Sequence, residues 1–174
     1  MYSIDVSNLF ISRYGDTLRL TNLSLNKLVY FAQVESLRRN DVPLFSDPIE
    51  AWEYGPVEPM VYYAFKKYGS SVITSPTDAG FSPKGATAEQ LAVIDAVARE
   101  YGSLTAFDLV DISHREGGAW RKKFIPGKNV QITNDDIIAS KEFRTGLDAK
   151  ATLSAGMRNV QDKWPNTLRM LEDA

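Results

Sequence analysis

The most regular pattern in this sequence lies in residues 21–40, which read TNLSLNKLVYFAQVESLRRN. Thr21 or Asn22 can begin a helix there, because a short polar side chain accepts a hydrogen bond from an amide of the first turn. Arg38 and Arg39 stand near the other end, where the helix dipole favours positive charge. Four apolar residues recur at helical spacing and predict one buried stripe: Leu25, Leu28, Val29 and Ala32.

The segments on either side of this long helix differ from each other. Before it, four apolar residues with helical spacing predict a short helix that Gly15 ends in the left-handed conformation: Val6, Leu9, Phe10 and Tyr14. After it, the prolines of residues 42–59 exclude a second long helix, because proline removes a backbone donor. Residues 49–54 can form a short extended segment between two turns. Pro59 then fits the first turn of a helix that Gly69 ends.

The second half of the sequence predicts three further helices. Thr87 and Gln90 have the spacing of a capping box and begin an amphipathic helix that runs to Gly102. Another helix follows at once and ends at Gly117–Gly118, and three residues share its apolar face: Phe107, Val110 and His114. After a short basic turn at residues 120–124 and a Pro126–Gly127 loop, a third helix starts with the capping pair Thr133 and Asp136 and reaches about Phe143.

Two stretches carry weaker patterns. Residues 70–86 contain few apolar anchors and predict a loop, or a small hairpin around residues 73–82. Residues 144–174 form an extension that is helical or partly flexible. Together the patterns predict a mainly α fold, a single compact helical domain of about six to eight helices with a minor β-hairpin.

The composition excludes several classes of functional site. The chain has 174 residues, no cysteine and one histidine, His114. Disulfide frameworks, thiol nucleophiles and cysteine-bound zinc are therefore excluded, and the lack of cysteine fits a reducing cytoplasm. The net charge of −2 gives no general attraction to nucleic acid, although residues 115–174, with 11 basic and 8 acidic residues, are mildly basic. No apolar run reaches the roughly 20 residues that span a bilayer, and we expect a cytoplasmic protein without a membrane partner.

Catalytic arrangements find little support in the residue patterns. Ser113 and His114 are adjacent on a predicted helix and point about 100° apart, so they cannot form a nucleophile and base pair there. His114 then becomes a buried or half-buried structural group, hydrogen-bonded through one ring nitrogen. The carboxylate pairs Glu50 with Glu53 and Asp135 with Asp136 fit a solvated surface, and the latter pair also fits the first turn of a helix. We predict no catalytic residue, no cofactor and no metal ion.

Three short basic clusters leave nucleic-acid binding as an alternative. They are Arg38–Arg39, Lys66–Lys67 and Arg121–Lys123, and each is too short to follow a phosphate backbone unless the fold brings them together. The first two clusters stand near helix ends, where cations are expected for local reasons. A nucleic-acid partner is therefore not expected.

One segment has the composition of a protein-binding surface. Residues 41–64 contain five acidic residues and five aromatic residues but no Lys or Arg. Aromatic side chains supply large contact area at low entropic cost, and uncompensated acids steer a basic partner toward them. The alternative is that Trp52 and Tyr54 pin a proline-rich loop to the core.

Two blocks of this sequence resemble the Panacea antitoxin domain, a family with SocA-like and GepA-like members from phages and prophages. The first block comprises residues 25–33, 43–45 and 49–62, and the second comprises residues 106–120. The resemblance covers about residues 20–143. The chain departs from the family pattern at Ser113, where threonine is usual, and at Gly118–Ala119, where a proline commonly precedes the tryptophan.

The resemblance implies a non-enzymatic antitoxin that binds and neutralises a toxin encoded by a neighbouring gene. In some members of the family the antitoxin also delivers the toxin to a Clp-type protease. Residues 1–143 would then be the antitoxin domain, and residues 144–174 an extension outside the match. A hydrolase that uses His114, or a nucleic-acid-binding regulator, remains the alternative. The expected partner-binding residues are Asp47, Glu50, Trp52, Glu53, Tyr54, Glu58, Tyr62, His114 and Trp120.

Overall fold

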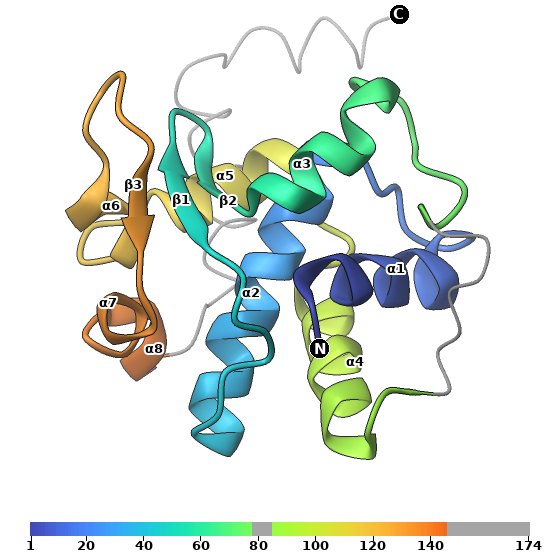
Figure 1. Ribbon diagram of the computed structural model, residues 1–174, viewed down its shortest axis with the longest axis horizontal. Coiled ribbons are helices and arrows are strands. Elements are labelled where there is room, and N and C mark those ends of the chain that lie inside the picture. The colour runs from blue at the N-terminus through green and yellow to red at the C-terminus, as the bar shows by residue number, and fades with distance from the viewer. Residues whose placement is uncertain (78–84, 146–174) are drawn as a thin grey trace, which may run out of the picture.

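The computed structural model describes residues 1–77 and 85–145, and it confirms a mainly helical fold with a small antiparallel sheet (Figure 1). Within these ranges the elements are α1 (Ser3–Tyr14), α2 (Asn22–Asn40), β1 (Ile49–Trp52), β2 (Gly55–Val57), α3 (Pro59–Phe65), the 3₁₀ turn η1 (Lys66–Tyr68), α4 (Ala88–Tyr101), α5 (Ala106–Ser113), α6 (Ala119–Lys123), β3 (Val130–Ile132), α7 (Asn134–Ile138) and α8 (Lys141–Thr145). Their eight α-helices agree with the predicted number. No helix in these ranges has the length and apolarity needed to cross a bilayer.

The long helix α2 is the centre of the molecule. Thr21 caps it, as predicted, by accepting a hydrogen bond from the amide of Ser24. Figure 1 shows α1 and α4 on one side of α2, and β3 with α6, α7 and α8 on the other. Because neighbours surround it, α2 buries residues on nearly every face, and the prediction of a single apolar stripe is too narrow. Buried polar side chains such as Gln33 make hydrogen bonds, in this case to the backbone carbonyl of Phe45.

The sheet has the strand order β2-β1-β3 and is antiparallel throughout. In β1, Glu50 lies opposite Val57 of β2 and opposite Gln131 of β3. The segment predicted to be extended over residues 49–54 therefore contains β1, and its two partner strands, β2 and β3, are not indicated by the sequence patterns. Gly55 begins β2 at a φ of +101°, a conformation that favours glycine, and this lets the chain turn back directly after residues 53–54.

Several local predictions are wrong, each for a tertiary reason. Gly15 is right-handed, with a φ of −59°, because the chain continues in tight turns to Leu18. Phe107 is 70% exposed, because α5 turns the face with Leu109 and Ile112 inward instead. Residues 119–123 form the helix α6 rather than a turn, since the buried carboxylate of Glu142 accepts a hydrogen bond from the amide of Ala119.

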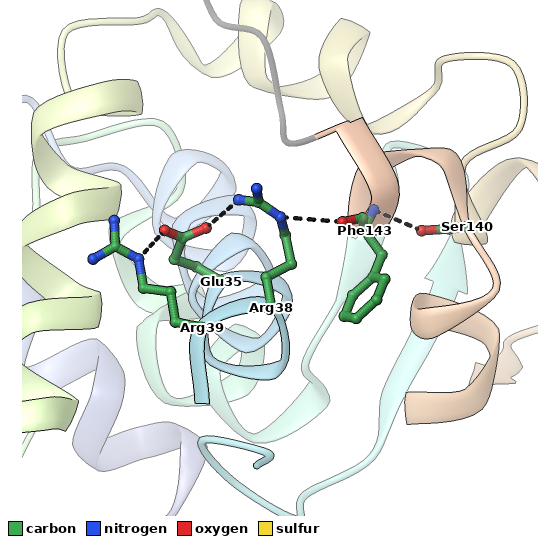
Figure 2. A network of polar contacts seen from close by, with 5 residues as sticks. All are labelled: Glu35, Arg38, Arg39, Ser140 and Phe143. Atoms are coloured by element: carbon green, nitrogen blue, oxygen red, sulfur yellow. Dashed lines mark hydrogen bonds and ion pairs between the residues drawn. The ribbon is translucent and has the colours of Figure 1, made fainter. Parts of the chain in front are cut away.

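The predicted helix over residues 133–143 is divided into α7 and α8. Ser140 lies between them, and its hydroxyl accepts a hydrogen bond from the amide of Phe143. Figure 2 shows how α2 holds this region: Arg38 donates to the carbonyl of Phe143, at 3.1 Å, and to Glu35, which also pairs with Arg39. These contacts fix α8 against the C-terminal end of α2.

Two regions of the sequence predictions lie partly outside the described residues. Residues 70–77 contain no strand, and the rest of the hairpin predicted around residues 73–82 falls in the undescribed range 78–84. The extension predicted from residue 144 is described only as far as Thr145. The division into residues 1–143 and 144–174 therefore stays a prediction.

Candidate functional site

A pocket of about 490 Å³ opens beside the turn that joins β1 to β2. Most of the residues that line it come from this turn, from β2, from the first turns of α2 and from the α3–η1 segment. They are Asn22, Leu23, Asn26, Trp52, Glu53, Tyr54, Val57, Tyr62, Lys66 and Gly69. We call this site the hairpin pocket. Its walls combine aromatic and aliphatic side chains with a few polar groups, which is the usual character of a binding pocket.

Packing between aromatic rings fixes one wall of the hairpin pocket. The rings of Trp52 and Tyr62 meet edge to face with their centroids 4.8 Å apart, and the ring of Tyr63 lies 5.3 Å from that of Tyr62. The indole of Trp52 also donates a hydrogen bond of 2.7 Å to the carboxylate of Glu50. Edge-to-face pairs of this kind add stability beyond the area that they bury. The Trp52 side chain is therefore held in a defined orientation.

Three exposed apolar side chains lie in the hairpin and in α3. Tyr54 is 59% exposed, and Met60 and Tyr63 are both 62% exposed. The Lys66 ammonium lies 5.7 Å from the ring centroid of Tyr63 and 6.0 Å from that of Tyr62. We call Tyr54, Met60 and Tyr63 the apolar rim. Tyr54 of this rim also lines the hairpin pocket. Exposed apolar groups beside a pocket are typical of surfaces that bind another protein.

The structure brings four of the predicted partner-binding residues together around the hairpin pocket. They are Trp52, Glu53, Tyr54 and Tyr62. Glu50 adjoins them through its hydrogen bond to Trp52. The sequence argument relied on the mixed acidic and aromatic composition of this segment, and the fold places much of that composition in one site.

Two acidic residues of the predicted set have local structural partners instead. Glu58 is only 2% exposed, and its carboxylate caps α3 by accepting hydrogen bonds from the amides of Met60 and Val61. Burial raises the pKa of Glu58 above its ordinary value, although those amide hydrogen bonds oppose the rise. Asp47 is half-buried and accepts a hydrogen bond of 2.7 Å from the amide of Ser3 at the start of α1. The structure therefore removes Glu58 from the surface on which we expected it.

Trp120 and His114 lie beneath the hairpin. Trp120 is 3% exposed, and its indole donates a hydrogen bond of 2.8 Å to the backbone carbonyl of Trp52. The His114 ring stacks on Trp120 with the centroids 3.6 Å apart and the planes within 3° of parallel. These two side chains support the hairpin from below, and the buried Trp120 is not part of the surface.

His114 is half-buried, as expected, but its bonding differs from the expectation. Its Nε2 atom is buried and has no hydrogen-bond partner among the residues that the structure describes. Burial, with the positive charges of Lys27 and Arg121, lowers the pKa of His114 to about 4, so the ring is neutral at pH 7. The hydroxyl of Ser113 donates to the carbonyl of Val110 at 2.7 Å rather than to the histidine. Within the described residues, no group of three His, Asp or Glu side chains is arranged to hold a metal ion.

Sequence reasoning missed a buried amine below the hairpin. Lys27 of α2 is fully buried, and its Nζ donates a hydrogen bond of 2.9 Å to the carbonyl of Pro56. The sequence does carry a pattern that predicts this burial, because Tyr30, Phe31 and Val34 follow Lys27 at spacings of three, four and seven residues. These residues continue an apolar face through the lysine position. Burial alone lowers the pKa of Lys27 to about 7.

Comparison with known proteins identifies the family. The family model described as "Antitoxin SocA-like, Panacea domain" matches residues 25–121, which include the β1–β2 turn, α3 and Trp120. The curated protein "Antitoxin SocA" of Caulobacter vibrioides (strain NA1000 / CB15N) is 32% identical over 132 aligned residues, an alignment that covers 66% of this chain and 66% of that protein. No solved structure matches the chain. The chain therefore belongs to the family of SocA-like antitoxins with a Panacea domain.

Proposed function

We propose that this protein is an antitoxin that neutralises a protein toxin, encoded by a neighbouring gene, by binding it directly at the hairpin pocket and the apolar rim. Membership of the antitoxin family supports the general role. The observation that carries the choice of site is the convergence of Trp52, Glu53, Tyr54 and Tyr62 on one pocket. A toxin surface covered by this site would be shielded from its own target.

The chemistry of the site favours a partner with an apolar side chain beside a basic one. The apolar side chain would enter the hairpin pocket and pack against the wall formed by Trp52 and Tyr62, because large aromatic contacts give most of the binding energy in typical interfaces. Glu53 is exposed at the turn and makes no ion pair with another residue of the described ranges, so its charge remains available to a basic group. The carboxylate of Glu50 already accepts the Trp52 hydrogen bond.

A non-enzymatic role agrees with the arrangement of the titratable groups. The side chains of Ser113 and His114, which would have to act in a hydrolase, do not bond to each other, and Ser113 is 1% exposed. The hydrolase hypothesis therefore loses Ser113 as an accessible nucleophile for His114.

The nucleic-acid hypothesis is also less favoured by the contacts of the basic cluster on α6. Arg121 pairs with Glu116, Lys123 pairs with Asp136, and Lys122 donates to a backbone carbonyl. Cations that already have partners contribute less to a phosphate-binding surface. Delivery of the toxin to a Clp-type protease stays a separate prediction, because it needs a second surface.

Growth and co-purification test the proposed function together. The neighbouring gene is expressed alone in a bacterial host and then with this protein, and the complex is isolated through a tag on the toxin candidate. We expect toxicity alone, relief on co-expression and a stable complex. Relief without association, or no toxicity, would contradict the proposal.

Matched variants test the site itself. Glu53→Lys and Tyr54→Ala change exposed residues of the pocket and are expected to weaken both the rescue and the complex. Glu100→Lys on α4 and Ile138→Ala on α7 make the same kinds of change at exposed residues that do not line the pocket. If all four variants rescue equally well, the toxin binds elsewhere.

A further inference from the structure

The backbone of the β1–β2 turn rests directly on a buried lysine. The Nζ of Lys27 lies 2.9 Å from the carbonyl oxygen of Pro56 in β2. Gly55 is packed so closely that an added Cβ atom would lie 2.8 Å from Lys27 Cε and 2.6 Å from Ser113 Oγ. A side chain at residue 55 would therefore require Lys27 and Ser113 to shift, or the turn to move. The close fit makes the turn sensitive to what happens at the lysine amine.

The buried amine has no counter-ion in the described part of the chain. Its recorded hydrogen bond goes to the neutral carbonyl of Pro56, and no carboxylate there forms an ion pair with it. A neutral amine carries no charge to compensate, and its hydrogen bond to this carbonyl is sufficient. A buried ammonium without a carboxylate is strongly unfavourable, because its charge has lost its hydration and gained no compensating partner.

We propose that Lys27 is a positioning residue for the hairpin pocket, and that proton uptake by its buried amine loosens the β1–β2 turn. When the amine is neutral, its hydrogen bond to Pro56 holds the turn in place. When it is protonated, the charge is relieved by water that enters beneath Gly55, and the turn lifts. Lys27 touches no partner itself and acts through the turn that carries Trp52, Glu53 and Tyr54.

The amine of Lys27 shares its surroundings with other titratable groups. Burial lowers the pKa of Lys27 to about 7. At the C-terminal end of α5, burial and the charges of Lys27 and Arg121 lower the pKa of His114 to about 4, so this ring stays neutral. At the start of α3, the carboxylate of Glu58 is held by backbone amides. On α2 itself, burial and the nearby Glu142 raise the pKa of Tyr30 well above its usual value.

A second hydrogen bond connects the residues around Lys27 to the pocket wall. The indole of Trp120 donates to the carbonyl of Trp52, the last residue of β1. Lys27 therefore holds the β2 side of the turn, and Trp120 holds the β1 side. If protonation of Lys27 lifts the turn, the indole N–H of Trp120 should report the change, because its hydrogen bond ends on the moving strand.

The test follows the tryptophan indole N–H signals of the full chain by ¹H–¹⁵N NMR between pH 5.5 and 9. In the wild type we expect the signals of Trp52 and Trp120 to shift together with a midpoint close to the Lys27 value of about 7. In Lys27→Met this transition should be absent. In the matched control Lys66→Met, which removes an exposed amine beside the same pocket, it should be retained.

Three results would overturn the proposal. One is a wild type whose two indole signals do not titrate between pH 6 and 8. Another is a transition that persists in Lys27→Met, and the third is one that disappears in His114→Gln while Lys27→Met retains it. If Lys27→Met does not fold, the ¹³Cε signals of the wild-type lysines decide: a buried lysine that titrates only near its ordinary value of 10.5 contradicts the proposal.

This inference rests on the proposed function only for its biological consequence. The NMR titration uses the protein without a partner, so an absent toxin complex would leave its outcome unchanged. Conversely, a missing titration would leave the co-purification result intact. When both hold, the toxin complex should weaken as pH falls from 8 to 6, and this dependence should be lost in Lys27→Met.

Discussion

The buried amine of Lys27 makes a quantitative prediction about the stability of the folded protein. Its pKa is about 7 in the folded state, against 10.5 for an ordinary lysine, so between these values the unfolded chain binds one more proton than the folded chain. Stability must then rise with pH in this window. The destabilising effect of burial is complete below pH 7 and is removed as pH approaches 10.5. One pH unit corresponds to about 1.4 kcal/mol per proton, so this residue adds about 2 kcal/mol between pH 7 and pH 9.

Urea unfolding followed by circular dichroism measures this effect. The free energy of unfolding is determined at pH 6, 7, 8 and 9 for the wild type, Lys27→Met and Lys66→Met. Other titrating groups contribute equally to each protein, so the difference between the wild type and Lys27→Met isolates the lysine. We expect this difference to change by about 2 kcal/mol in favour of the wild type from pH 7 to pH 9. Lys66→Met should follow the wild type, and parallel curves for all three proteins would contradict a lowered pKa for Lys27.

Three further substitutions test individual contacts. Trp120→Phe removes the hydrogen bond to the carbonyl of Trp52 and should lower the free energy of unfolding by about 1–3 kcal/mol, which thermal unfolding can measure. Glu58→Ala removes the cap of α3 and should cost about 0.5–2 kcal/mol in a urea titration, and an unchanged midpoint would argue against the cap. Asp95→Asn breaks the bidentate ion pair with Arg13. Because the side chains of Asp95 and Arg13 are 31% and 35% exposed, the free energy of unfolding should fall by less than about 1 kcal/mol, and this difference should shrink in high salt.

The helices were predictable because their start signals are local. Thr21, Thr87 and Thr133 each cap a helix in the structure by accepting a hydrogen bond from an amide three residues later. No distant residue is needed to recognise such a pattern. By contrast, β3 pairs with β1 across about 80 residues of sequence, and three residues are too short to show the alternation of a strand. That strand depends on where α6 and α7 place the chain.

The candidate site shows the same division between local and distant information. Trp52, Glu53 and Tyr54 are neighbours in the sequence, so their unusual composition predicted a protein-binding surface, and in the structure these residues line the pocket. The opposite wall, with Asn22 and Asn26, is formed by packing of α2 against the hairpin and has no mark in its own sequence. A list of surface candidates also cannot distinguish exposed acids from buried helix caps.

Toxin binding at the hairpin pocket and its rim can be measured in solution. The most direct measurement is the dissociation constant between this protein and the purified product of the neighbouring gene, determined by calorimetry for the wild type, Tyr54→Ala and the α7 control Ile138→Ala. Truncation of a central interface aromatic typically costs 2 kcal/mol or more, so we expect binding by Tyr54→Ala to weaken by about 30-fold or more. The control should bind like the wild type. Equal dissociation constants for all three proteins would contradict toxin binding at the hairpin pocket.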